Sequence, residues 1–154
     1  MKYFLILTLL IMNSCGEKKQ QKENVSQNPT EIIAIKKVLE TQQECWNNGD
    51  INGFMQGYWN SPKLQFRSNK NELTSGWKAT LERYKKNYPT KESMGELKFE
   101  TLNIESFANN TLSKIEGKWE LIRKTDNPKG KFWLELHRFN ENKWVIVKDS
   151  TISF

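Results

Sequence analysis

The last third of the chain alternates between apolar and polar residues, and this pattern constrains the fold more than any other feature of the sequence. Segment 117–153 contains three such stretches, which the turn sequences TDNPKG and FNEN separate. A period of two residues predicts antiparallel strands with one buried face. Arg123, Asp149 and Thr151 interrupt the apolar positions of that face. They are either the polar groups of a ligand pocket or the solvated end of a sheet.

Strand-like patterning extends upstream, so that everything from Glu96 onward is predicted to be β structure. The apolar positions change parity between Phe99 and Leu102, which is what a β-bulge produces inside one strand. Residues 109–110, Asn-Asn, suit a tight turn between this strand and the next.

The first half of the chain contains three segments with apolar residues at helical spacing. We expect Thr30 to cap the first helix, Asp50 the second and Ser75 the third. A short strand, KLQFRS, lies between the second and third helices. This order predicts an α+β fold, in which three N-terminal helices pack on a curved, bulged antiparallel sheet and leave a cone-shaped pocket.

The N-terminus indicates a cellular location. An apolar run from Tyr3 to Met12 follows Lys2 and is too short to span a bilayer comfortably, as in a signal peptide. It ends at Met12-Asn13-Ser14-Cys15, which resembles a bacterial lipobox. We therefore expect residues 1–14 to be a lipoprotein signal peptide and lipidated Cys15 to anchor the protein in the bacterial cell envelope, on the periplasmic or surface side. The alternative is an ordinary secretory signal with an incidental cysteine.

Composition divides the remainder into a tether and one domain. Residues 15–29 contain almost no apolar side chain and are predicted to be a flexible tether. Residues 30–154 are long enough for one domain with a core. Hydrophobic residues make up only 36% of the chain, but the 12% that are aromatic bury large areas. If Cys15 is acylated, Cys45 has no disulfide partner, and we interpret it as a small core residue.

Several function classes lack support in the sequence. The formal net charge is +6, but the basic residues are scattered among acids, so we expect no nucleic-acid partner. A single histidine, His137, does not support a metal centre. Neither a glycine-rich phosphate loop nor a nucleophile motif is present, and we expect no cofactor.

The turn sequences predict a strand register. The simplest closure of FNENKW pairs Phe139 with Trp144, which places Leu134 opposite Asp149. Val145 and Val147 then lie on the core face. The same register gives the pairs Phe132–Thr151 and Glu135–Lys148.

The turn TDNPKG, closed with Lys124 opposite Lys131, places Arg123 opposite Phe132. Arg123, Asp149 and Thr151 then lie near one end of the core face, as polar groups on an apolar wall. The alternative is an Arg123–Asp149 salt bridge at the sheet rim. A register slip of one residue would turn the whole set outward.

Five segments resemble the small SnoaL-like, ketosteroid-isomerase-like proteins of the nuclear transport factor 2-like superfamily, over residues 31–152. These segments are CWNNGDINGFMQGYW, TSGWKATLERYKKNYP, GELKFETLNIES, SKIEGKWELIRK and KWVIVKDST. The resemblance implies a helix-on-sheet fold with a cavity. Family members often end the last strand with Asp-His-Thr, whereas this chain has Asp149-Ser150-Thr151, so any role of that histidine is absent.

The outer face of the predicted sheet is too apolar to be fully solvated, with Trp133, Phe139, Trp144 and Ile146 exposed there. Because members of the family commonly dimerise through the sheet, the resemblance implies a homodimer through this face. The alternative is a C-terminal or loop segment that covers it.

Two functional hypotheses follow. The first is an envelope-tethered, non-catalytic domain that binds an apolar ligand or partner, and the sequence favours it because only one acid can be named. The second is a small isomerase, lyase or cyclase with Asp149 as general acid–base, since the resemblance implies a carboxylate and sometimes a tyrosine donor. Tyr58 and Tyr84 are candidates for that donor, although neither matches a family motif. A third is a scaffold whose pocket its own side chains fill. The residues expected to contact a ligand, or otherwise to be plain core, are Trp46, Tyr58, Trp59, Phe66, Trp77, Tyr84, Trp119, Arg123 and Thr151.

Overall fold

A computed structural model of the chain describes residues 28–69, 72–107, 110–140 and 143–154. The expected signal peptide, Cys15 and most of the expected tether lie outside these residues, as does Asn109 of the expected Asn-Asn turn. The elements are α1 (Pro29–Asn47), α2 (Ile51–Phe54), a 3-10 turn η1 (Met55–Gly57), β1 (Gln65–Arg67), β2 (Leu73–Ser75), α3 (Trp77–Asn87), α4 (Lys91–Met94), β3 (Glu96–Phe107), β4 (Leu112–Ile122), β5 (Lys129–Phe139) and β6 (Lys143–Ser153).

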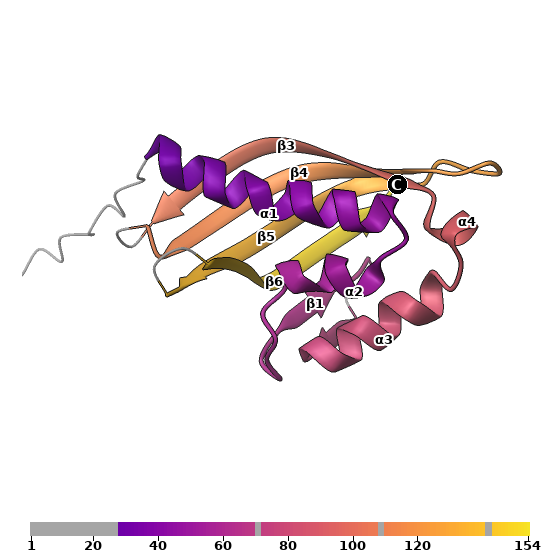
Figure 1. Cartoon of the computed structure of the whole chain (residues 1–154), viewed down its shortest axis with the longest axis horizontal. Helices are drawn as coiled ribbons and strands as arrows, with labels where there is room; N and C mark the ends of the chain where they lie inside the picture. The colour runs from indigo at the N-terminus through magenta and orange to yellow at the C-terminus, as the bar shows by residue number, and fades with distance from the viewer. Residues whose placement is uncertain (1–27, 70–71, 108–109, 141–142) are drawn as a thin grey trace, which may run out of the picture.

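The α+β class is confirmed, with helices on one face of an open six-stranded sheet. The strand order is β2-β1-β6-β5-β4-β3, and four long curved strands form most of the sheet (Figure 1). The sheet is mixed rather than purely antiparallel, because β1 runs parallel to β6. In Figure 1, α1 lies along the long strands and α3 lies at the β1 end.

The helix caps differ in part from the expected ones. Asn28, not Thr30, caps α1, because its side chain accepts a hydrogen bond from the Thr30 amide at 3.1 Å. Pro29 then occupies the first helical position, where its missing N–H costs nothing. Asp50 caps α2 as predicted, through a 2.8 Å bond from the Gly53 amide.

The third helix begins without a side-chain cap. Ser75 belongs to the short strand β2 and pairs with Gln65, so Gly76 precedes α3 instead. Both β2 and α4 were missed in the sequence because segments of three or four residues are too short to display a period.

The core lies between the helices and the concave face of the sheet. The buried stripe of α1 packs against α2, α3 and the inner side chains of the long strands. The predicted bulge in β3 is confirmed, because the pairing with β4 shifts between Thr101 and Asn103. Leu102 is the extra residue there and is exposed. The most buried apolar residues are Ile35, Met55, Leu64, Ile115, Leu136 and Ile146.

The hairpin between β5 and β6 contains a second bulge, which was not predicted. Phe139 pairs with Lys143, so the predicted Phe139–Trp144 pairing is wrong by one residue. The register shifts at Val147, which opposes no single residue of β5. Beyond the bulge, the predicted Leu134–Asp149 pair forms, as do Phe132–Thr151 and Glu135–Lys148.

This bulge reverses the faces of the residues before it. Trp144 and Ile146 lie on the inner face, where both are buried, and not on the outer face as predicted. Val145 pairs with His137 on the outer face, so its expected core-face position is wrong as well. The outer face retains Trp133 and Phe139, which are 41% and 37% exposed.

The hairpin between β4 and β5 also pairs differently from the prediction. Gly117, rather than Arg123, lies opposite Phe132, and Trp119 lies opposite Gly130. The difference is six positions, an even number, so the side chains of β4 keep their predicted faces. Arg123 lies beyond the last pair, where its amide donates to the carbonyl of Asp126.

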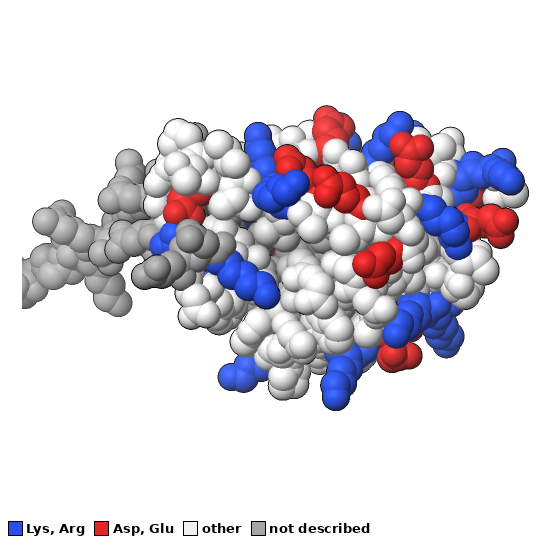
Figure 2. Space-filling view, viewed as in Figure 1, with Lys and Arg blue, Asp and Glu red and all other residues white. Residues whose placement is uncertain are grey.

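Charges on the described part of the helix-covered face are mixed in sign. Figure 2 shows lysine and arginine side chains interspersed with aspartate and glutamate, without a continuous basic stripe. Among the described residues, no helix is both long and apolar enough to cross a bilayer.

Candidate functional site

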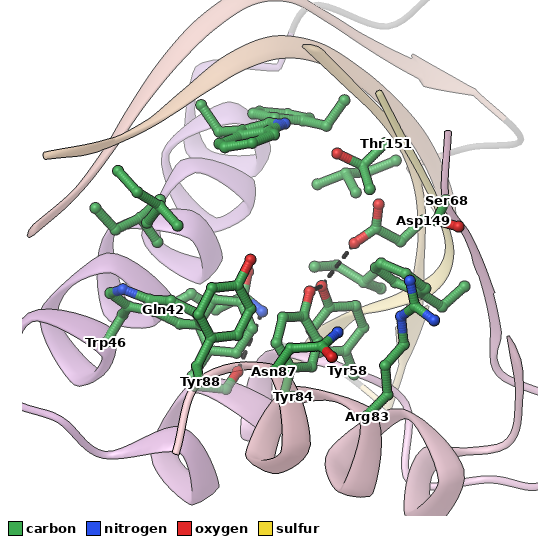
Figure 3. A pocket seen from close by; sticks show the side chains of 18 of the residues that line it. Gln42, Trp46, Tyr58, Ser68, Arg83, Tyr84, Asn87, Tyr88, Asp149 and Thr151 are labelled. Atoms are coloured by element: carbon green, nitrogen blue, oxygen red, sulfur yellow. Dashed lines mark hydrogen bonds between the residues drawn. The ribbon is translucent and has the colours of Figure 1, made fainter. Parts of the chain in front are cut away.

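A cavity of about 360 Å³ lies between the helices and the inner face of the sheet. Helices α1 and α3 form one side, and β3 to β6 form the other (Figure 3). Most of the wall is apolar and comes from Leu39, Phe54, Leu97, Leu121, Leu134 and Ile146. The exposed residues Asn69, Glu72 and Asn87 border the opening.

Regular periodicity brings the polar lining residues together. Tyr84 lies on α3 and Tyr88 directly follows the helix, and their rings stack at a centroid distance of 6.2 Å. Asp149 and Thr151 are two residues apart on β6 and therefore share the inner face of the sheet. Gln42 lies on the buried stripe of α1.

Aromatic rings brace the helix side of the cavity. The ring centroids of Trp46 and Tyr88 are 4.8 Å apart, and those of Phe54 and Tyr84 are 5.1 Å apart. Both pairs meet edge to face, which is a favoured geometry for aromatic side chains. Contacts of this kind restrict the rings and preserve the shape of the cavity.

Asp149 is the most unusual residue of the cavity. It is only 6% exposed, although carboxylates are rarely buried without full pairing. Its Oδ2 accepts a hydrogen bond of 2.6 Å from the Tyr58 hydroxyl (Figure 3). Its Oδ1 is buried and has no hydrogen-bond partner among the described residues. One oxygen of the carboxyl group therefore has unused hydrogen-bonding capacity.

Burial raises the pKa of Asp149 from 3.8 to about 6, and the hydrogen bond from Tyr58 acts in the opposite direction. Loss of hydration disfavours the charged form, and no described cation compensates by pairing with it. The carboxyl group can consequently hold or release a proton close to neutral pH.

Tyr58 and Tyr84 extend the polar group into a short chain. Their hydroxyl oxygens are 3.2 Å apart. Because the Tyr58 hydrogen is used towards Asp149, Tyr84 is the donor in this second bond. Burial, and then the charge of Asp149, raises the pKa of both tyrosines well above 10, so both remain protonated donors at neutral pH.

A second buried polar atom in the wall has no partner among the described residues, and it is the Trp119 Nε1. The indole lies over Gly130, where a Cβ atom would come within 2.8 Å of this nitrogen. The carbonyl oxygen of Ile152 would be closer still, so a larger residue at position 130 would clash with β6 as well as with the indole.

The structure brings most of the sequence-predicted site residues together. Six of the nine expected ligand contacts line the cavity together with Asp149. These six are Trp46, Tyr58, Phe66, Tyr84, Trp119 and Thr151.

Three of the expected residues lie elsewhere. Trp59 stacks on Phe139 at a centroid distance of 5.2 Å, away from the cavity. The Trp77 Nε1 donates to the Met55 carbonyl at 2.9 Å, which fixes the indole as a packing residue.

Arg123 is the third residue outside the lining. Its guanidinium forms two 2.7 Å bonds with Asp126 and one of 3.1 Å with the Ser93 carbonyl. The alternative of an Arg123–Asp149 salt bridge is therefore wrong. The cause is the register of the β4–β5 hairpin, which carries Arg123 past the end of the paired strands.

Gln42, Arg83 and Tyr88 are among the polar lining residues that sequence reasoning missed. The sequence did contain an indication of Gln42, because this polar residue stands in the apolar stripe of α1 between Leu39 and Trp46. Its Nε2 donates to the Phe54 carbonyl at 3.1 Å, which satisfies one end of the buried amide.

The described residues support neither a metal centre nor a cysteine nucleophile. No group of three or more His, Cys, Asp or Glu side chains there is arranged to hold a metal ion. The pKa of the Cys45 thiol is raised, chiefly by burial, so this thiol is a poor nucleophile.

Solved structures with the same fold identify the class of protein. A nuclear transport factor 2-like protein of unknown function from Shewanella oneidensis is 41% identical, with a TM-score of 0.74, over 81% of this chain and 99% of that one. A ketosteroid isomerase-like protein from Erwinia carotovora is 12% identical, with a TM-score of 0.66, over 80% of this chain and 96% of that one. No protein-family model and no curated protein matches the chain.

A helix-covered open sheet with an internal cavity defines the class of nuclear transport factor 2-like folds. The chain belongs to the nuclear transport factor 2-like family, as its likeness to the Shewanella protein shows. The family resemblance inferred from the sequence is thereby confirmed.

Proposed function

We propose that this protein binds a small, largely apolar ligand in the cavity between its helices and its sheet. The observation that supports this most strongly is the buried Asp149, whose Oδ1 has no described partner. An unsatisfied carboxylate oxygen in an apolar wall destabilises a fold, which makes it a mark of a binding site. The cavity volume of about 360 Å³ falls within the range of small-molecule pockets.

The ligand that fits this cavity has an apolar body and one polar group near Asp149. Above the pKa of about 6, the Oδ1 of Asp149 accepts a hydrogen bond from a ligand N–H or O–H. Below that pH, the protonated carboxyl donates to a ligand carbonyl. The rings of Trp46, Phe66 and Trp119 supply the apolar contacts.

A fluorescent naphthalene probe tests the proposal. N-phenyl-1-naphthylamine, a neutral two-ring amine, brightens when it enters an apolar site. We expect it to bind the full-length protein, and Thr151→Trp to abolish binding by filling the cavity. Ile152→Trp is the matched control, because Ile152 is the next residue of β6 and faces away from the cavity. Equal binding by the two variants would contradict the proposal.

An acid–base enzyme is the second candidate, and a specific observation favours it. Burial places the pKa of Asp149 at about 6, near the operating pH of a general acid–base, beside the protonated donor Tyr58. The ionised carboxylate can remove a proton from carbon next to a carbonyl group, while the Tyr58 hydroxyl holds the carboxylate in position. Among the described lining residues, no second acid lies in the inner wall, since Glu72 is exposed.

Deuterium exchange distinguishes the two candidates. Carbonyl compounds that raise the melting temperature would be incubated with the protein in heavy water and followed by NMR. An enzyme of this kind exchanges the proton next to the carbonyl, and Asp149→Asn abolishes the exchange. A binding domain gives the same slow exchange with either form.

The location and assembly are part of the same proposal. The lipobox-like MNSC supports an envelope protein tethered through Cys15. Incorporation of labelled palmitate, lost in Cys15→Ser, tests this anchor.

The exposed Trp133 and Phe139 on the outer face of the sheet support a homodimer through that face.

A further inference from the structure

Arg83 is the one basic residue that lines the cavity in the described part of the chain. It precedes Tyr84 on α3, and its guanidinium carbon lies 5.2 Å from the centre of the Phe66 ring. Figure 3 shows Arg83 rising from α3 towards the side of the cavity that holds Asp149 and Ser68. A cation held over an aromatic ring is attracted to it and loses freedom, so the guanidinium is positioned in advance.

This guanidinium has no carboxylate partner among the described residues, in contrast to two other arginines. Arg123 forms an ion pair with Asp126, and Arg138 forms one with Glu31, each at 2.7 Å. Arg83 forms neither an ion pair nor a hydrogen bond with a described group. Its five N–H donors therefore remain available at the cavity wall.

The positive charge of Arg83 extends into the cavity. Burial raises the pKa of Tyr84 and of Tyr88, and the charge of Arg83 acts in the opposite direction on both. Arg123 adds to this effect on Tyr88. Arg83 therefore offsets part of the penalty that burial imposes on a negative charge at these hydroxyl groups.

Asp149 and Arg83 differ in charge and in burial. Asp149 is buried and disfavours an anion beside it once it is ionised. Arg83 is only partly buried, and Ser68 and Asn87 add neutral hydrogen-bonding groups to the lining. Glu72 also borders the opening and opposes an anion there, but it is exposed, so solvent screens its charge.

From this arrangement we infer that the ligand is an amphipathic anion, whose acidic group binds Arg83 at the opening while its apolar body fills the cavity. This inference rests on the proposed ligand-binding function and specifies the chemical class of the ligand. A planar guanidinium matches the two oxygens of a carboxylate or sulfonate. The neutral polar group of the same ligand then faces Asp149.

Two naphthalene probes that differ in one charged group test the inference. 8-Anilinonaphthalene-1-sulfonate has the ring system of N-phenyl-1-naphthylamine and an added sulfonate group. We expect Arg83→Gln to weaken binding of the sulfonate about tenfold, since it removes a charge-assisted contact. The neutral probe should bind both forms within a factor of two.

Lys86→Gln is the matched control, because it removes one positive charge from an exposed position of the same helix that does not line the cavity. It should change the affinity for either probe less than twofold. If Arg83→Gln and Lys86→Gln weakened sulfonate binding equally, the effect would come from the net charge of the protein and not from a contact with Arg83. That result would overturn the inference.

The remaining outcomes separate this inference from the proposed function. If the neutral probe binds in a manner that Thr151→Trp abolishes, but Arg83→Gln leaves sulfonate binding unchanged, the anionic ligand is rejected and the binding cavity stands. If neither probe binds a site that Thr151→Trp blocks, both proposals fail.

Discussion

Two carboxylates on the helix side of the molecule have opposite surroundings. Glu31 lies at the start of α1, where Oε1 accepts a 2.7 Å bond from Arg138 and Oε2 accepts a 3.0 Å bond from the Trp144 indole. Asp149 is buried deeper and has a single hydrogen bond, from Tyr58 at 2.6 Å. Its second oxygen has no described partner.

The difference separates a structural role from a functional one. Glu31 joins the start of α1 to the end of the sheet, and both of its oxygens are satisfied. Asp149 is charged above pH 6 in a place that disfavours the charge, and the residue lines a cavity. A residue that reduces stability without completing a contact marks a site selected for function.

Replacing each carboxylate by the matching amide tests this contrast, and the largest effect is expected at Asp149. Its pKa is raised in the folded state, so the folded chain keeps a proton that the unfolded chain loses between about pH 4 and pH 6. Stability therefore falls as the pH rises through this window and stays low above it. A shift from 3.8 to about 6 corresponds to on the order of 3 kcal/mol.

Asp149→Asn removes this penalty. We expect it to raise the free energy of unfolding at pH 8 by up to about 3 kcal/mol, and to change it little below pH 4. Urea unfolding of the wild type and the variant at pH 8 and below pH 4 measures the change in the free energy of unfolding at each pH. A variant that is less stable than the wild type at pH 8 would assign Asp149 a structural role like that of Glu31.

The hydrogen bond from Tyr58 is expected to have the next largest effect. Tyr58→Phe removes the one donor to Asp149, which raises the pKa of Asp149 further and should cost about 2 kcal/mol at pH 8. Tyr84→Phe is the control, since its hydroxyl contacts Tyr58 and not the carboxylate. Its cost in urea unfolding should be about half as large. Equal costs would indicate that the hydroxyl groups act only through packing.

Glu31→Gln should act in the direction opposite to Asp149→Asn. It leaves Arg138, whose side chain is 24% exposed, without a charged partner, and should cost about 1 to 2 kcal/mol. Glu40→Gln removes an exposed ion pair with Lys37 and should cost less than about 0.5 kcal/mol. If the unfolding curves showed that Glu31→Gln stabilises the protein, Glu31 and Asp149 would not differ in their effect on stability.

The smallest effect on the folded monomer is expected at the outer face. Trp133→Lys should change its free energy of unfolding by less than about 0.5 kcal/mol, because the ring is 41% exposed. If the outer face joins two copies, the variant should sediment as a monomer. Ile33→Lys, at an exposed position of α1, serves as the control and should remain dimeric. A monomeric wild type would refute the proposed homodimer.

The fold was predictable from the sequence because its long elements display clear periods. The stripes of α1 and α3 and the alternation of β4 and β5 gave the class and the order of the elements. The bulge at Val147 left no such signal, because Trp144 to Val147 are four consecutive apolar residues with no alternation to disturb. The faces of Trp144 and Ile146 were therefore predicted wrongly.

The site was predictable only where local geometry determines it. Asp149 and Thr151 were placed correctly because the unseen bulge at Val147 offset the one-residue error at the turn. Arg123 was misplaced because the length of a hairpin loop, which sequence does not fix, determined its position. Arg83 was missed because its contact with Phe66 joins two distant elements.

The pKa of Asp149 tests the account most directly. The carboxyl carbon, labelled with carbon-13, would be followed by NMR from pH 3 to pH 9 and assigned by its loss in Asp149→Asn. We expect a midpoint of about 6, because the group is buried beside a single described donor. A midpoint at or below 3.8 would mean that the carboxylate is fully stabilised in the fold. The cavity would then lack the free acceptor on which the proposed function depends.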